Sequence, residues 1–234
     1  MYELIDQVID EGCWFEYKKL FAPELITGFA RINGAVKGII ANQSKVKGGT
    51  LFVDSPDKAA RFIMICNAYN IPLLYLSDVP GYMIGSKVEQ SGIIRHGAKM
   101  ISALSEASVP IISVIVRKCF GAGLYAMAGP AFGSDAVLAL PSAQIAVMGP
   151  DTAVNAVSSN HIEAIEDPKE KLAFVQEKHA EYQKEIDIYK LASELIIDEI
   201  VAPNDLREVL KERFDYYSTK SIPQPPRKHP VYPV

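Results

Sequence analysis

Residues Val109–Met127, VPIISVIVRKCFGAGLYAM, predict a buried strand that runs into a glycine-rich turn and then into a helix. β-branched apolar residues dominate positions 109–116, a pattern typical of a strand covered on both faces. Arg117 and Lys118 are expected to end this strand. Residues 121–123, Gly-Ala-Gly, then stand where the helix begins, and the first N–H groups of a helix have no partner within it.

Amide groups left unpaired at such a turn can bind a negatively charged oxygen without help from a side chain. The same glycines also allow a helix and a strand to pack closely, and the turn alone does not distinguish these two roles. The spacing Gly121-x-Gly123-x-x-Ala126 fits part of the dinucleotide-binding turn of Rossmann folds as well. That third role is disfavoured, because the next predicted strand ends in Pro141-Ser142 and offers no carboxylate for a ribose.

The composition is that of an ordinary globular protein, with 49% hydrophobic and 22% charged residues among 234. We expect one domain over residues 1–221 and an extended, proline-rich tail over residues 222–234. A net charge of -4 gives no support for a nucleic-acid partner. The longest uncharged stretch, residues 119–134, contains several glycines and is shorter than the roughly 20 residues of a membrane helix, so no membrane segment is predicted.

The three cysteines, Cys13, Cys66 and Cys119, are far apart and form no CxxC pair. The histidines also lack the spacing of metal ligands. The first twelve residues, MYELIDQVIDEG, have neither the basic nor the apolar region of a signal peptide. We therefore predict free thiols, no metal site and a cytoplasmic protein.

Turn signals and hydrophobic periodicity divide the chain into alternating strands and helices. Asn33-Gly34 between two apolar runs predicts a hairpin of strands 25–32 and 35–41. Ser55 is expected to cap a helix over residues 57–69. Apolar periodicity further predicts helices 2–10, 93–106, 168–196 and 205–217, strands 71–76, 136–140 and 145–148, and a loop over 77–92. A hairpin followed by strand–helix units favours an α/β fold of stacked β-β-α repeats with a long C-terminal helical region.

Five segments in fixed order carry a resemblance to a known family: DSPDKAARFI, IPLLYLSDVPGY, SGIIRHGAKMISALSEASVPIISVIVRK, FGAGLYAMAG and PSAQIAVMGP. The chain resembles the C-terminal half of the carboxyltransferase (β) subunits of biotin-dependent acyl-CoA carboxylases. Propionyl-CoA and 3-methylcrotonyl-CoA carboxylases are examples. The resemblance implies a crotonase-like fold and an enzyme that moves CO2 between carboxybiotin and the α-carbon of an acyl-CoA.

In this family each half of the subunit contributes an oxyanion hole built from backbone amides. The resemblance places the amides that hold the ureido oxygen of biotin at Ala122 and Gly123. It implies further that the biotin and substrate pocket is lined by Phe120, Gly121, Tyr125, Gly81 and Tyr82. For the last two, a turn glycine with a packed aromatic ring is an equally good interpretation.

The resemblance also implies partners. They are an N-terminal carboxyltransferase half that binds most of the CoA, a biotin carboxylase or biotin carrier subunit, and further copies of the chain. Without the N-terminal half the chain is expected to be inactive. The acyl group stays open. Propionyl-CoA carboxylases tend to have Asp at the position of Tyr125, so the turn followed by Tyr125 resembles the methylcrotonyl-type enzymes. The segments DVPGY and IIRHGAK, in contrast, resemble the propionyl type.

Two other functions stay open beside this one. A self-contained crotonase-type hydratase or thioesterase would need a Glu pair or an Asp near the glycine turn. Asp135 is the nearby acid in the sequence, and it is expected just before a strand. A non-catalytic half would use the apolar seam of the helix over 168–196, together with the tail, to build an oligomer.

Overall fold

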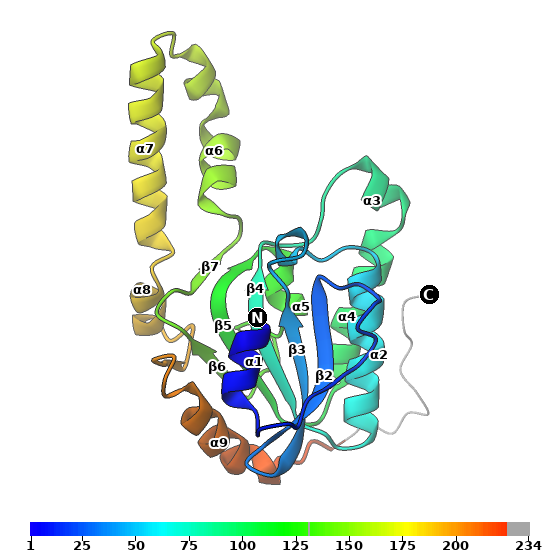
Figure 1. Ribbon diagram of the computed structural model, residues 1–234. Coiled ribbons are helices and arrows are strands. Elements are labelled where there is room, and N and C mark those ends of the chain that lie inside the picture. The colour runs from blue at the N-terminus through cyan, green and yellow to red at the C-terminus, as the bar shows by residue number, and fades with distance from the viewer. Residues whose placement is uncertain (131, 224–234) are drawn as a thin grey trace.

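The computed structural model describes residues 1–130 and 132–223 and has a central β-sheet with helices on both faces (Figure 1). Over these residues the strands follow the spatial order β1-β2-β3-β4-β5-β6-β8, and β7 pairs separately with β5. Their bounds are β1 Phe15–Glu16, β2 Leu25–Ile32, β3 Ala35–Asn42, β4 Leu73–Val79, β5 Ile111–Phe120, β6 Ala136–Ala139, β7 Gln144–Ala146 and β8 Glu199–Ile200. The predicted tail lies outside the described residues except for positions 222 and 223.

The predicted hairpin is confirmed. Strands β2 and β3 pair antiparallel, with Ile32 opposite Ala35. The two turn residues between them, Asn33 and Gly34, have φ angles of 53° and 76°. Positive φ at both central positions is the geometry of a two-residue turn whose twist matches that of the strands.

Strands β3, β4, β5 and β6 are parallel neighbours. Helix α2, Asp54–Ala68, connects β3 to β4, and helix α4, Ile93–Glu106, leads into β5 with the predicted bounds. The prediction that Ser55 caps α2 was wrong, because α2 begins at Asp54. The Ser55 hydroxyl instead donates to Glu24 Oε1 over 2.7 Å and accepts the Phe52 N–H over 3.1 Å.

Alternating residues of each strand supply two hydrophobic cores, one on each face of the sheet. Ile40 and Tyr75 point into the core under α2, α4 and the short helix α5, Ala122–Ala126. Ile39 and Leu74 point into the opposite core, under α1, Tyr2–Val8, and α9, Leu206–Tyr216. The parallel strands are therefore covered on both sides, as their continuous apolar sequences predict.

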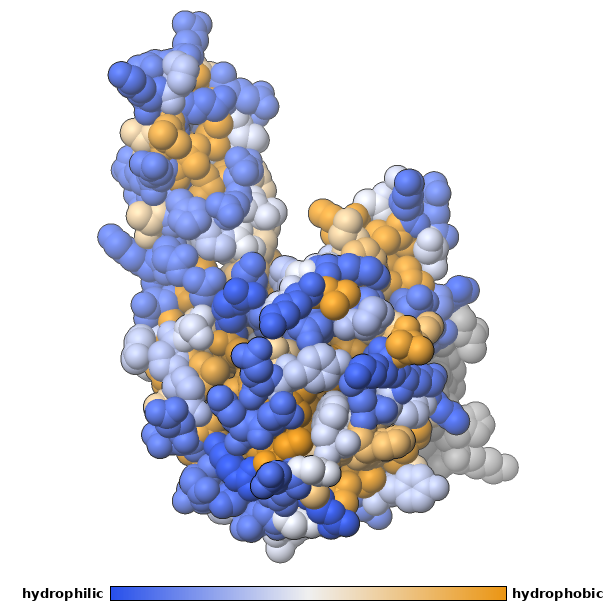
Figure 2. Space-filling model, in the orientation of Figure 1, coloured by the Kyte–Doolittle hydropathy of each residue, from blue (hydrophilic) through white to orange (hydrophobic). Residues whose placement is uncertain are grey.

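A helical arm projects from the sheet and consists of α6, Pro150–Ala164, and α7, Pro168–Glu185 (Figure 1). Helix α7 contributes no buried residue, and apolar side chains such as Val157 and Leu172 stay exposed on the arm (Figure 2). The prediction of one helix over 168–196 was wrong. A separate helix, α8, Ile188–Ser193, follows α7, and the Asp187 carboxylate caps it by accepting the N–H groups of Tyr189 and Lys190.

The remaining elements are short. Helix α3, Ser86–Gln90, lies within the predicted loop over 77–92, and the 3-10 turns η1, Lys47–Gly49, and η2, Tyr217–Thr219, complete the described chain. No helix in this part of the chain is long and apolar enough to cross a membrane. The three cysteines are free thiols.

Candidate functional site

The glycine turn follows a strand that is longer than the sequence suggests. The prediction that Arg117 and Lys118 end β5 was wrong, because β5 continues to Phe120. Its pairing with β4 shifts: Ser77 lies opposite Ile115, but Val79 lies opposite Cys119, so two steps along β4 match four along β5. The charged pair therefore sits in a bulge, where a strand can bend and carry side chains that do not enter the core.

Beyond the bulge the chain turns sharply into α5. Lys118–Phe120 pair with β7, and the Gly121 N–H donates to Ala146 O over 3.0 Å. Gly121 has φ 56° and ψ -143°, a conformation that is open to glycine and costly for other residues. A Cβ at this position would also lie 3.2 Å from Val147 O.

Two amides at the start of α5 have no hydrogen-bond acceptor among the described residues. The Leu124 N–H donates to Gly121 O over 3.1 Å. The N–H groups of Ala122 and Gly123 have no acceptor among residues 1–130 and 132–223. Ala122 is exposed, whereas Gly123 is buried. This is the pair that the sequence predicts as an oxyanion hole, and the structure leaves both donors unpaired.

The loop after β4 packs directly against these amides. A Cβ built on Gly123 would lie 3.1 Å from Gly81 Cα and 3.0 Å from Val79 Cγ2, so only glycine allows this approach without a shift. The loop is held on its other side by Leu51, whose N–H donates to Gly81 O over 3.1 Å and whose carbonyl accepts the Met83 N–H over 2.9 Å. The loop at Gly81 is thus packed against residues 121–123 on one side and hydrogen-bonded to Leu51 on the other.

A groove of about 350 Å³ opens beside Ala122. The Tyr82 ring forms one wall and packs on Gly97 of α4, where an added Cβ would lie 3.2 Å from Tyr82 Cε1. The other lining residues are mostly apolar: Met83, Ile84, Glu89, Ile93, Ile94, Ala98 and Ile101. The Tyr82 hydroxyl is buried without a hydrogen-bond partner in the described part of the chain, and burial raises its pKa far above 10.0, so it is a neutral donor.

Of the five predicted pocket residues only Tyr82 is in the lining of this groove; Gly81 and Gly121 adjoin it through the contact of loop and turn, and the other two aromatic residues lie farther off. Phe120 is buried, and its ring packs on Gly149 at the start of the arm, where an added Cβ would lie 3.2 Å from Phe120 Cε2. Tyr125 is 48% exposed and meets the Phe132 ring edge-on, with 5.7 Å between the ring centroids. The structure therefore brings Gly81, Tyr82 and the turn together and leaves Phe120 and Tyr125 toward the arm.

Sequence reasoning missed an ion pair at the base of the site. The buried Asp78 carboxylate accepts Arg117 Nε over 3.1 Å and Arg117 Nη2 over 3.0 Å. It also accepts the Lys118 N–H over 3.3 Å. The available signal was the acid at the start of DVPGY and a basic pair that interrupts an apolar strand, two features that the folded chain places side by side.

The nearby acid in the sequence, Asp135, is remote in the structure. Its carboxylate accepts the Ile111 N–H and Lys220 Nζ, each over 2.7 Å, at the start of β5. Because β5 has ten residues, the glycine turn lies about 30 Å away along the strand. Glu89 is the only carboxylate in the lining of the groove. The groove lining therefore holds one carboxylate rather than the Glu pair that a self-contained hydratase would use.

The sequence of the chain matches the model of the carboxyl transferase domain over residues 1–232. The chain belongs to this family. It is 62% identical over 234 residues to an uncharacterized carboxylase, YngE, of Bacillus subtilis (strain 168), covering 100% of this chain and 46% of that protein. It is 42% identical over 232 residues to the methylmalonyl-CoA carboxyltransferase 12S subunit of Propionibacterium freudenreichii subsp. shermanii, covering 99% of this chain and 44% of that protein.

Solved structures of carboxyl transferases share the fold. The transcarboxylase 12S crystal structure with methylmalonyl-coenzyme A and methylmalonic acid bound gives a TM-score of 0.92 at 42% identity, over 99% of this chain and 44% of that one. The β subunit of Pseudomonas aeruginosa geranyl-CoA carboxylase gives 0.83 at 30% identity, over 92% and 41%. The predicted crotonase-like α/β fold is confirmed, and this carboxyl transferase domain spans less than half of the length of its relatives.

Proposed function

We propose that this chain is the biotin-side half of an acyl-CoA carboxyltransferase, which moves CO2 between carboxybiotin and the α-carbon of an acyl-CoA. The observation that carries the proposal is the pair of unpartnered N–H groups at Ala122 and Gly123, of which Ala122 lines an apolar groove. Membership of the carboxyl transferase domain family supplies the class of reaction.

The residues at the turn fit the urea group of biotin. Carboxybiotin, when bound, supplies the CO2 and a ureido oxygen that becomes negatively charged as CO2 leaves. Two backbone donors suit that oxygen because they are fixed by α5 and cannot turn away. Each such donor contributes about 3 kcal/mol to stabilisation of the transition state. The groove beside Ala122 provides apolar walls, in which a charge-assisted hydrogen bond is stronger than it is in water.

The chain's own side chains take other tasks in this proposal. Tyr82 shapes the pocket and offers a neutral hydroxyl, since burial keeps its pKa raised. Gly81 and Gly123 permit the close approach of loop and turn. Phe120 and Tyr125 border the site on the side of the arm. Arg117 and the Lys118 N–H already occupy the Asp78 carboxylate, and Glu89 is the carboxylate in the groove lining, so in this proposal the substrates carry the proton transfer.

The proposal includes partners. An N-terminal carboxyltransferase half would bind the acyl-CoA and supply the second oxyanion hole. A biotin carboxylase or biotin carrier subunit would deliver carboxybiotin. The solved 12S relative is described as a hexamer assembly, and we propose that further copies of this chain complete a comparable oligomer in the cytoplasm.

The test is carboxyl transfer from an acyl-CoA to free biotin, with and without the N-terminal half. Malonyl-, methylmalonyl- and methylglutaconyl-CoA serve as donors, and the product is free carboxybiotin. Activity only on addition of the N-terminal half is the expected result, and the preferred donor identifies the acyl group. Transfer by this chain alone would contradict the proposal that the N-terminal half is required to bind the acyl-CoA.

A second measurement separates this function from a structural role. Free biotin should protect the peptide that contains Ala122 and Gly123 from hydrogen–deuterium exchange in the assembled enzyme, because both amides then acquire an acceptor. The absence of both transfer and protection would refute the proposal and leave an oligomerisation half. Hydration or thioester hydrolysis in place of transfer would favour a crotonase-type enzyme.

A further inference from the structure

The bulge in β5 fixes the direction in which the chain enters the glycine turn. Up to Ile115 the strand keeps regular parallel pairing with β4, and after the bulge Lys118–Phe120 pair with β7 as well. Beyond the bulge β4 leads to Gly81 and β5 leads to Gly121, and these two segments pack together at the turn. Bulges re-aim the residues that follow them, and an irregular ladder needs other contacts to hold it.

The Asp78 carboxylate provides those contacts. It accepts hydrogen bonds from Arg117 Nε over 3.1 Å, from Arg117 Nη2 over 3.0 Å and from the Lys118 N–H over 3.3 Å. All three donors belong to the bulge. A carboxylate in a bidentate hydrogen bond with a guanidinium is fixed in orientation as well as in distance. Asp78 therefore fixes the bulge to β4 at a defined position.

Asp78 is itself held from the other side. Its N–H donates to Asn42 Oδ1 over 3.1 Å, and Asn42 Nδ2 donates to Gly49 O over 3.2 Å. Gly49 has φ +76°, and a Cβ there would lie 2.7 Å from Asp78 O. Asp78 on β4 is thus bonded to β5 through its carboxylate and to β3 through its backbone N–H, at the strand ends that carry the site.

We propose that Asp78 and Arg117 form a clamp that positions the Ala122 and Gly123 amides against Gly81; the inference rests on the proposed function of those amides. Asp78 lies three residues before Gly81 in the sequence, and Arg117 lies four before Gly121. The two partners therefore set the relative position of the two chain segments that meet at the oxyanion hole. Neither side chain lines the groove, so both are positioning residues.

The test compares Arg117→Ala with Arg213→Ala in the assembled enzyme, the chain together with its N-terminal half. Arg213 pairs with Glu199 over 2.8 Å on α9 and β8, away from the turn, so its variant removes an ion pair without touching the clamp. We expect Arg117→Ala to lower kcat for transfer by about 10- to 100-fold with the KM for acyl-CoA unchanged. Arg213→Ala should retain the wild-type kcat.

Two readouts separate positioning from general stability. Because the Arg117 side chain is 52% exposed, guanidinium ion from solution can enter the vacated place, and it should restore kcat in Arg117→Ala. The Gly121 and Leu124 amides, which are hydrogen-bonded in the turn, should exchange faster with deuterium in Arg117→Ala and not in Arg213→Ala. Asp78→Asn should show the same faster exchange and no response to guanidinium.

The outcomes distinguish this inference from the proposed function. Unchanged exchange and unchanged kcat in Arg117→Ala would overturn the clamp, as would equal losses in both arginine variants. If the wild-type enzyme transfers no carboxyl group, the proposed function fails. The exchange comparison then decides by itself whether Asp78 and Arg117 hold the turn, because it needs no activity.

Discussion

Replacement of Ala122 by proline deletes one proposed donor and little else. Ala122 is the first residue of α5 and is exposed, and its N–H has no acceptor in the described part of the chain. Proline is well tolerated at this first helical position, and α6 and α7 of this chain both begin with one, Pro150 and Pro168. The preceding residue, Gly121, has no side chain to clash with the proline ring.

The expected magnitude follows from this geometry. Ala122→Pro breaks no hydrogen bond among the described residues, so the free energy of unfolding should stay within about 1 kcal/mol of the wild-type value. Loss of one oxyanion donor lowers kcat by about 100- to 1000-fold, which corresponds to about 2.7–4 kcal/mol in the transition state. The assay is transfer from the preferred acyl-CoA to free biotin, beside thermal unfolding of the same variant.

A matched control deletes an equivalent amide elsewhere. Ser86 is the exposed first residue of α3 and likewise follows a glycine, Gly85. Ser86→Pro should retain the wild-type kcat. If Ala122→Pro unfolds cooperatively and transfers carboxyl groups as fast as the wild type, the Ala122 amide does not stabilise the transition state. Equal losses in both proline variants would show that the loss comes from the proline ring at a helix start rather than from the missing donor.

Three further substitutions test the core and the groove. Burial lowers the pKa of Lys58 from 10.5 to about 8, so the unfolded chain binds more protons between these values and the free energy of unfolding rises with pH there. Between pH 8 and 10.5 the free energy of unfolding of the wild type, measured by urea denaturation, should rise by about 3 kcal/mol relative to that of Lys58→Met. Parallel curves of this free energy against pH for the two proteins would contradict the prediction. Gly38→Ala places a Cβ 2.5 Å from Cys66 Sγ and should cost about 1–3 kcal/mol in the same assay, whereas an unchanged midpoint would refute this packing. Gly97→Ala places a Cβ 3.2 Å from Tyr82 Cε1 and should raise the KM for free biotin, while an unaltered KM would place biotin away from this ring.

Local signals in the sequence account for much of the fold. Asn33-Gly34 specifies its hairpin because both residues adopt positive φ, and α4 follows from a regular apolar stripe. Elements that depend on distant contacts were placed less well. The end of β5 was misplaced, since Arg117 finds its partner, Asp78, 39 residues away along the chain. Helix α6 was not predicted, because its sequence has only a weak apolar stripe and packs mainly on α7.

The candidate site divides in the same way. The turn at residues 121–123 could be predicted because its conformation depends on local glycines. The meeting of Gly81 with Gly123 depends on parallel pairing of β4 and β5, which no local signal in either segment specifies. The lining of the groove could not be predicted, since it arises where α3, α4 and the loop after β4 converge.

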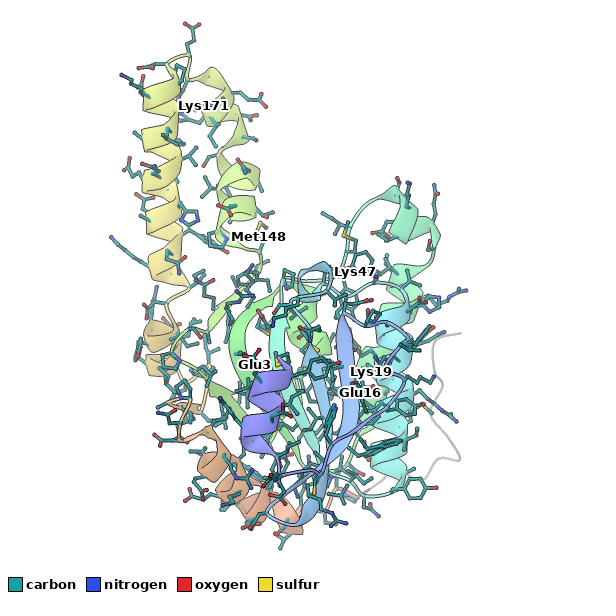
Figure 3. All side chains as sticks on the ribbon, viewed as in Figure 1. Glu3, Glu16, Lys19, Lys47, Met148 and Lys171 are labelled. Carbon is teal, nitrogen blue, oxygen red and sulfur yellow. The ribbon has the colours of Figure 1, made fainter. Side chains whose placement is uncertain are left out.

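The two outermost strands of the sheet order, β1 and β8, are only two residues long. Little unpaired backbone is therefore offered for a strand of another molecule to extend the sheet. Side chains on the helices, and on the arm that begins near Met148 (Figure 3), therefore offer more surface to neighbouring molecules than the outer strands do. Recognition of that kind changes by single substitutions at the surface, so a family built on this sheet can acquire new partners while its interior stays the same.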